Sequence, residues 1–375
     1  MKAFLKHPMR YLCTLLTFLF VATALPAAAQ PKAAPNAAPR KAATVSTPAD
    51  DAIIRDGVRL HDQEKYDEAI AKYQEVLAHS PANMTALYEM AFSYLAKKDY
   101  VKGRDAANRG TEYASDMLPM FYDLLGESYD AAGEPQKAIE QYERGIAAVP
   151  DASVLYHNMA ITYLESLKNE GEARRSLKRG ADVDPTDVDI QLMLGQVFRS
   201  GGYQTPALLA FSKALLFDPT NGRALQAIGW WRAILRGGLP ATSGGQATAM
   251  ASQTPASKTD EGDFSAIDRQ FAIGQQAIVT AMDNGAGEMP TLLAQVNDIV
   301  TRLAALDPGK YKETFVGRQY LPYFAELKKR NDVEPFVYWI LQRAPVTGVR
   351  DWLDKNKPRV QAFLEWTNQF PWDAR

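Results

Sequence analysis

The chain has 375 residues, of which 46% are hydrophobic and 23% are charged, as is ordinary for a soluble globular protein of two or three domains. Its formal net charge is −2. Removal of the leader described below, which carries three basic and no acidic residues, changes this to −5. This mild acidity argues against nucleic acid as the main partner.

The first 29 residues are typical of a secretory signal peptide. Three basic residues precede a mostly apolar run at 11–25, and Ala27 and Ala29 then satisfy the small-x-small cleavage rule. We therefore expect cleavage after Ala29 and a periplasmic or secreted mature chain. The alternative is an uncleaved anchor, but the run is shorter than the roughly 20 residues of a spanning helix. No later stretch is long and apolar enough to span a membrane.

Two stretches of unusual composition divide the rest of the chain. Residues 30–50 are rich in alanine and proline and have almost no large apolar side chain, which predicts an extended, mobile linker. Residues 237–263 consist largely of Gly, Ser, Thr, Ala and Gln, which predicts a flexible interdomain linker. The densely patterned region 51–236 lies between them, and 264–375 is expected to form a C-terminal helical domain.

The patterned region repeats every 34 or 35 residues. A small residue recurs near the start of each second helix, at Ala69, Gly103, Ala138, Ala173 and Ala207. Four residues later stand Tyr73, Ala107, Tyr142, Leu177 and Phe211. The first helices also share a small residue, at Gly57, Ala91, Gly126, Ala160, Gly195 and Gly229. Small residues let antiparallel helices approach closely, and a large residue fills the space beside that contact. The pattern predicts stacked helical hairpins.

This period and these residues resemble the tetratricopeptide repeat family. The expected repeats are approximately 50–83, 84–118, 119–152, 153–187 and 188–221, with a sixth first helix at 222–236. One extra residue near Lys168–Gly171 should lengthen the turn inside the fourth repeat. The predicted fold is all-α: a superhelix of two-helix repeats followed by the C-terminal helical domain.

The resemblance implies that the first helix of each repeat lines a concave groove. The residues expected there are spaced four apart on one helix face and are Ile54, Val58, Tyr88, Phe92, Asp123, Glu127, His157, Ile161, Leu192, Gln196, Gln226 and Trp230. Some family members clamp a C-terminal carboxylate with lysine and asparagine at such positions, and this chain has neither there. A groove that is apolar near Tyr88 and Phe92 and acidic at Asp123 and Glu127 suits a peptide with apolar anchors and a basic residue. Alternatively, Tyr88 and Phe92 only cover a neighbouring repeat.

The C-terminal part has helical periodicity and many aromatic residues. Residues 265–285 and 289–309 predict a helical hairpin, and further helices are expected around 312–330, 333–343, 346–355 and 358–370. Twelve aromatic residues fall between Phe315 and Trp372. Aromatics at helical spacing are typical of a core, but exposed tryptophans would instead suit stacking on sugar rings.

Together these features predict an exported scaffold or adaptor that binds a peptide or protein segment in its groove within the cell envelope. The alternative is a glycan- or cell-wall-binding module that uses the C-terminal aromatics. We expect no enzyme activity, cofactor or metal. The only cysteine, Cys13, lies in the leader, and His61, His79 and His157 lack the spacing of a metal site.

Overall fold

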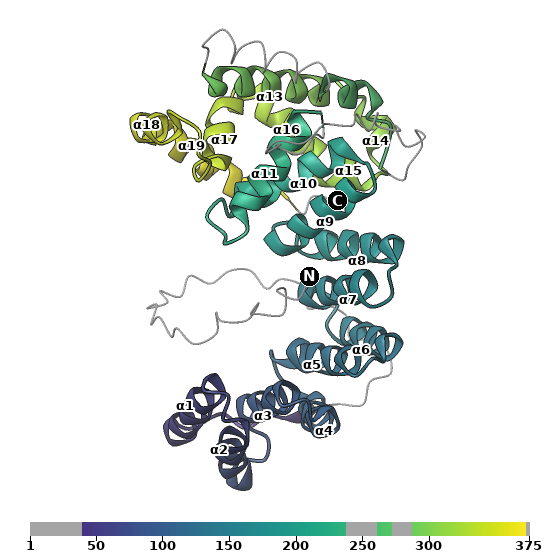
Figure 1. The fold of residues 1–375 in the computed structure, drawn as a ribbon, viewed down its shortest axis with the longest axis vertical. Helices are drawn as coiled ribbons and strands as arrows, with labels where there is room; N and C mark the ends of the chain where they lie inside the picture. The colour runs from purple at the N-terminus through teal and green to yellow at the C-terminus, as the bar shows by residue number, and fades with distance from the viewer. Residues whose placement is uncertain (1–39, 238–260, 272–286, 373–375) are drawn as a thin grey trace, which may run out of the picture. The chain divides into compact units, whose positions relative to one another are not determined.

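The computed structural model describes residues 40–237, 261–271 and 287–372. The predicted signal peptide, and residues 30–39 and 238–260 of the two predicted linkers, lie outside this range. In the described chain, almost all regular structure is helical, as the sequence predicted. Figure 1 shows helices following one another as antiparallel pairs from α1 to α10.

Five helical hairpins and one further helix make up the repeat region. Their bounds are α1 (Pro48–Asp62) with α2 (Tyr66–His79), α3 (Met84–Ala96) with α4 (Tyr100–Thr111), α5 (Leu118–Ala131) with α6 (Pro135–Ala148), α7 (Ser153–Glu165) with α8 (Glu170–Val183), α9 (Val188–Ser200) with α10 (Gln204–Phe217), and α11 (Ala224–Leu235). Three residues separate the two helices of every hairpin except α7–α8, which has four. The longer turn predicted in the fourth repeat is therefore confirmed.

The two helices of a hairpin meet where a small residue faces a large one. A Cβ atom added at Gly126 of α5 would lie 2.3 Å from the ring of Tyr142 in α6. Tyr142 is almost fully buried, so the ring fills the space that the missing side chain leaves. Gly57 meets Tyr73 in the first repeat in the same way. The small and large residues that recur in the sequence are thus the residues through which paired helices contact each other.

Residues 40–50 differ from the predicted mobile linker. The backbone of β1 (Lys41–Ala42) pairs in parallel with β2 (Tyr113–Ala114), which follows the second repeat. The Thr44 amide also donates a 2.9 Å hydrogen bond to the carbonyl of Ala82. Thr47 then caps α1, whose first turn lies inside the predicted linker. Alanine-rich composition indicated a chain without its own core, but it did not reveal that backbone hydrogen bonds hold this part of the segment to the repeats.

The C-terminal residues form short helices that share one core with the later repeats. They are α13 (Glu288–Ala304), α14 (Pro308–Tyr311), α15 (Phe315–Gln319), α16 (Leu321–Lys329), α17 (Val333–Ile340), α18 (Val349–Lys355) and α19 (Lys357–Gln369). One cluster of buried apolar side chains joins Phe211 and Trp231 of the repeats to Phe271, Val300 and Phe336. The predicted C-terminal helices are present, and their apolar side chains share one core with α10 and α11. Of the predicted hairpin helix at 265–285, only residues 265–271 fall in the described chain, and they are helical.

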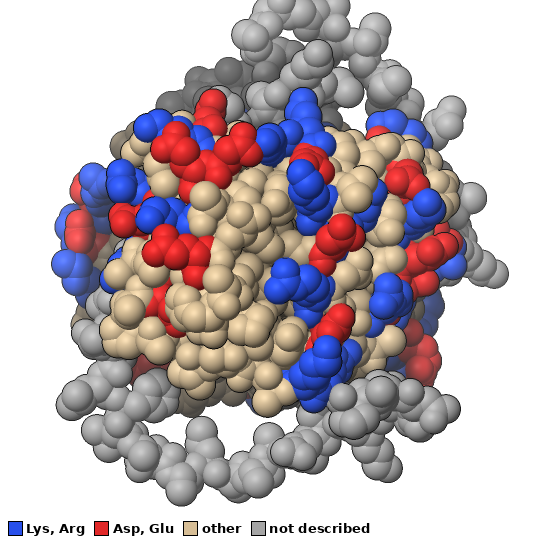
Figure 2. Space-filling view, turned by 90° about the horizontal axis from the view of Figure 1, so that it is seen from below, with Lys and Arg blue, Asp and Glu red and all other residues tan. Residues whose placement is uncertain are grey.

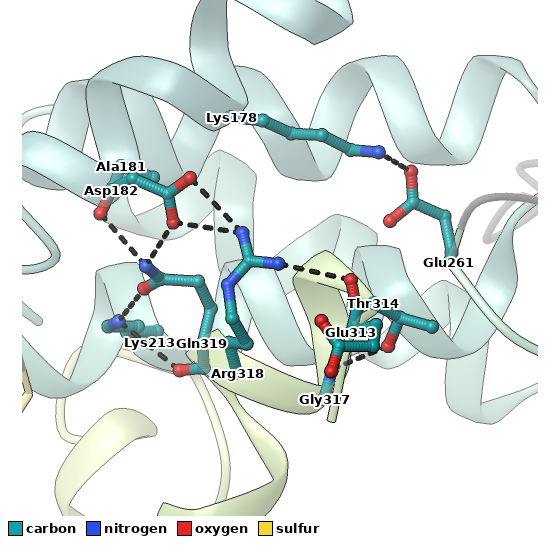
Figure 3. A network of polar contacts seen from close by, with 10 residues as sticks. All are labelled: Lys178, Ala181, Asp182, Lys213, Glu261, Glu313, Thr314, Gly317, Arg318 and Gln319. Atoms are coloured by element: carbon teal, nitrogen blue, oxygen red, sulfur yellow. Dashed lines mark hydrogen bonds and ion pairs between the residues drawn. The ribbon is translucent and has the colours of Figure 1, made fainter. Parts of the chain in front are cut away.

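Polar side chains reinforce this junction (Figure 3). Glu261, only 1% exposed, forms an ion pair with Lys178 of α8. Nearby, Gln319 donates a 2.9 Å hydrogen bond to Asp182, and Arg318 forms an ion pair with the same carboxylate. Residues 261–263 were predicted to belong to a flexible linker. Glu261 instead lies buried against α8, because two cations of that helix, Arg174 and Lys178, attract its carboxylate.

Candidate peptide-binding surface

The first helices of the early repeats form one side of the array. In addition to packing on its own partner, α3 contacts both α1 and α5, and α5 contacts α7. In the described chain, consecutive second helices make no comparable contact. Because first helices approach one another more closely than second helices do, the first helices lie on the inner side of the local curve. We call the exposed and half-buried side of α1, α3, α5 and α7 the first-helix face.

Aromatic rings cover one end of the first-helix face. The His61 and Phe92 rings stack with centroids 4.9 Å apart, and Phe92 stacks in turn on Tyr88 at 6.3 Å. Tyr88 is only 5% exposed and meets Phe121 of α5 edge-on. Phe92 is half-buried and accessible from this face. The structure therefore gives the two predicted anchors different places: Tyr88 covers the neighbouring repeat, and Phe92 lies half-buried on the first-helix face.

Carboxyl groups follow these rings along the face. Asp123 and Glu127 are one turn apart on α5, and Asp130 follows on the same helix. Burial raises the pKa of Asp123, and burial together with the charges of Asp123 and Asp130 raises the pKa of Glu127. Burial and the charge of Asp62 raise the pKa of Glu89 on α3 to about 7. No basic side chain offsets these three shifts in the described chain.

We call Glu89, Asp123 and Glu127 the acidic row, and α7 supplies polar partners to it and to the neighbouring Asp130. Asn158 donates a 2.5 Å hydrogen bond from Nδ2 to Asp123, and its Oδ1 atom lies 3.0 Å from Nδ1 of His157. Thr162 donates to Asp130 at 3.2 Å. Burial lowers the pKa of His157, whose Nε2 atom is buried and has no hydrogen-bond partner among the described residues. The surroundings of the acidic row thus favour the uncharged form of its carboxyl groups when no cation is bound.

The remaining predicted groove residues lie further along the array or in its core. Ile161 is half-buried on α7, whereas Leu192 on α9 is 2% exposed and belongs to the core. Gln196 is half-buried and Gln226 is exposed. Trp230 packs on Phe211 with ring centroids 5.4 Å apart, and Arg199 covers the same indole at 5.4 Å. In the first repeat, Ile54 is buried and Val58 is half-buried.

Sequence reasoning missed Glu89, Asp130, Asn158 and Thr162. Asp130 lies seven residues after Asp123, two turns along the same helix, so helical spacing could have identified it. Glu89 and Asn158 each lie directly beside a predicted groove residue. They were missed because the prediction took only two positions, four residues apart, from each first helix. Their roles depend on the angle between successive first helices, which sequence spacing does not give.

Other kinds of site are less well represented in the described residues. No group of three or more His, Cys, Asp or Glu side chains there could hold a metal ion. Nor does any described helix have the length and apolar character needed to cross a membrane. On the face shown in Figure 2, basic and acidic side chains are interspersed around an uncharged area rather than gathered into a patch of one sign.

The tryptophans of the C-terminal part pack inward. The Trp339 indole donates a 2.9 Å hydrogen bond to the carbonyl of Leu216, and Trp366 stacks on Tyr323 at 5.0 Å. Trp352 lies parallel to Tyr338 at 4.1 Å and is half-buried. These contacts favour the core interpretation of the aromatics over the glycan-binding alternative.

Comparison with protein families matched residues 60–127 to the model of the tetratricopeptide repeat. A comparison with curated proteins found no match. Several solved structures are similar to part of this chain. TTC0263, a thermophilic TPR protein of Thermus thermophilus, is 21% identical over 49% of this chain and 97% of its own, with a TM-score of 0.38.

Two further solved structures have the same kind of overlap. The MamA protein of Desulfovibrio magneticus RS-1, from residue 41 to its end, is 15% identical over 47% of this chain and 98% of its own, with a TM-score of 0.36. YrrB, described as a TPR protein with an unusual peptide-binding site, is 19% identical over 48% of this chain and 93% of its own, with a TM-score of 0.32.

Proposed function

We propose that this chain binds a segment of a partner protein on its first-helix face, because tetratricopeptide repeats, on which it is built, form scaffolds for protein interactions. The observation that carries this proposal is the combination of Phe92 with the acidic row of Glu89, Asp123 and Glu127. An apolar anchor on the partner would pack on Phe92. A lysine or arginine nearby would reach the half-buried Glu89 and Glu127, and it would act on the buried Asp123 through its charge.

The electrostatic part of the proposal rests on the raised pKa values. A carboxyl group with a raised pKa in the free protein gains little from water or from neighbouring cations. A bound lysine or arginine favours the charged form of the carboxyl group, so it lowers the pKa of that group and donates charge-assisted hydrogen bonds to it. Glu89, Asp123 or Glu127 should therefore lose protons when a basic side chain binds, whereas the basic side chain itself should keep its proton.

The cellular part of the proposal rests on residues outside the described structure. The leader at 1–29 has the pattern of a secretory signal peptide, with cleavage expected after Ala29. We place the mature chain in the periplasm or outside the cell, where its partner would be another envelope protein. Detection of the intact leader on protein recovered from the envelope would contradict this placement.

Affinity capture from an envelope fraction tests the binding proposal. The variants Phe92→Ala and Glu127→Gln each remove one feature of the first-helix face. Tyr88→Ala would be a poorer choice because Tyr88 packs against Phe121 and its loss would also destabilise the repeats. Glu140→Gln, on the exposed side of α6, is the matched control. Captured partners should be lost with the first two variants and kept with the control. Equal capture by all of them, with folding intact, would overturn the proposal.

A further inference from the structure

A lysine lies buried at the junction between the repeats and the C-terminal helices. Lys213 of α10 is 2% exposed, and its Nζ atom donates to Gln319 at 3.1 Å. Its ammonium lies over the rings of Trp372, at 4.6 Å, and Tyr320, at 5.5 Å. It forms no ion pair in the described chain, which is unusual because a buried ammonium without a carboxylate partner is costly.

The charged groups facing Lys213 are already engaged with other residues. On α8, Asp182 pairs with Arg318 and accepts from Gln319, while Asp184, directly after that helix, accepts from Thr186. Both carboxylates favour the ammonium, but burial outweighs them and lowers the pKa of Lys213 to about 7.

The titratable groups that face Lys213 from α16 and its N-terminal boundary are phenols. The Tyr320 hydroxyl donates to Gln191 at 2.7 Å, and the Tyr323 hydroxyl lies 3.0 Å from Thr367. Burial raises the pKa of both phenols, so both are uncharged at neutral pH. Phe336 completes the surroundings from α17 and carries no charge. Neither phenol therefore stands in as an anion for the missing carboxylate.

The cover over Lys213 comes from the last described residues of the chain. After α19 ends, Trp372 returns to α10, where its ring meets Phe217 at 5.1 Å, and it also contacts Tyr323 at 4.5 Å. Its indole nitrogen donates to the carbonyl of Thr367. Phe370–Trp372 lies outside any helix, whereas the other groups around Lys213 lie on helices of the core or directly beside them. Movement of Trp372 is therefore the simplest way to hydrate the ammonium.

We propose that Phe370–Trp372 is a clip over Lys213 that closes more tightly when Lys213 loses its proton. In the closed clip the amine titrates near pH 7, and in an open clip it would titrate near the ordinary lysine value of about 10.4. The closed form therefore binds fewer protons between these limits. Raising the pH through this window should increase the ratio of closed to open clip by up to about tenfold per pH unit. Below about pH 7 the ratio should be constant, because both forms are then protonated.

Competitive acetylation of the full chain tests this proposal. Acetic anhydride reacts with neutral amines, and mass spectrometry reports each lysine separately. Exposed Lys312 should react faster with rising pH up to about 10. Lys213 should react slowly, and its rate should level off above about pH 7 because closure then offsets deprotonation. Trp372→Ala should accelerate Lys213 at least about tenfold and give it the profile of Lys312.

Two further results decide between the clip and ordinary burial. Trp372→Phe keeps a ring over the ammonium, so the acetylation rate of Lys213 should still level off in this variant. This variant is the control for a general effect of substitution at position 372. The proposal is overturned if Lys213 of the unmodified protein follows Lys312, a result that requires no variant to fold. It is also overturned if Trp372→Ala leaves the plateau in place.

Discussion

The side-chain amide of Asn158 on α7 donates a 2.5 Å hydrogen bond to the carboxyl group of Asp123 on α5. This bond crosses from one repeat to the next on the first-helix face. It favours the charged form of Asp123, whereas burial opposes that form and prevails. The acidic row is therefore preorganised by neutral donors and, among the described residues, left without a cation of its own. A basic side chain of a partner would supply that cation.

The acidic row makes stability depend on pH in a defined direction. Glu89 titrates near 7 in the folded chain and near 4.5 when unfolded, so the folded state binds more protons between these values. Its contribution is full below about pH 4.5 and is lost as the pH rises through 7. Glu89→Gln should therefore raise the unfolding free energy by about 1–3 kcal/mol at pH 8 and by little at pH 4. Urea unfolding at the two pH values measures this difference.

The exposed Glu140→Gln on α6 provides the control for that measurement. It should change stability by less than about 0.5 kcal/mol at either pH. If Glu89→Gln and Glu140→Gln have the same effect at pH 8 and pH 4, Glu89 is not desolvated as the structure indicates.

Two helical glycines should respond oppositely to the same substitution. Gly126→Ala places a methyl group within 2.3 Å of the Tyr142 ring and should destabilise the chain by about 1–3 kcal/mol. Gly229 of α11 is exposed and has no described atom within 4 Å of an added Cβ, so Gly229→Ala should stabilise by about 0.5–1 kcal/mol through helix propensity. Thermal unfolding of both variants measures this. Equal shifts of the same sign would show that helix approach does not decide the role of Gly126.

The C-terminal helices should not behave as an independent domain. A chain ended at residue 236 would expose the apolar side of α10 and α11, including Leu216, Trp231 and Leu235, which the C-terminal helices now help to cover. We expect lower stability and faster amide exchange in α9 to α11 of this truncated chain. Unchanged exchange there, or two separate calorimetric transitions in the full chain, would contradict the shared core.

Much of the repeat region could be predicted from sequence because its contacts are local. Gly126 and Tyr142 recur with their equivalents at one spacing, so the periodicity indicated that small and large residues pack together where paired helices approach, as Gly126 and Tyr142 do. The shared core could not be predicted in this way, because Trp339 reaches Leu216 across 123 residues and no periodicity records that contact. The acidic row was partly predictable: Asp123 and Glu127 follow helical spacing, whereas Glu89 and Asn158 join them through the angle between repeats. Whether Phe92 or Tyr88 is accessible likewise depends on that angle.

Selection from a random peptide library on the full chain tests the central claim most directly. Peptides bound by the unmodified protein at pH 8 should combine an aromatic or aliphatic residue with lysine or arginine. Phe92→Ala and Glu127→Gln should each weaken binding of such a peptide about tenfold or more, while Glu140→Gln should bind as the unmodified protein does. Enrichment of acidic peptides, or equal affinity for all three variants, would contradict a first-helix face built for a basic segment.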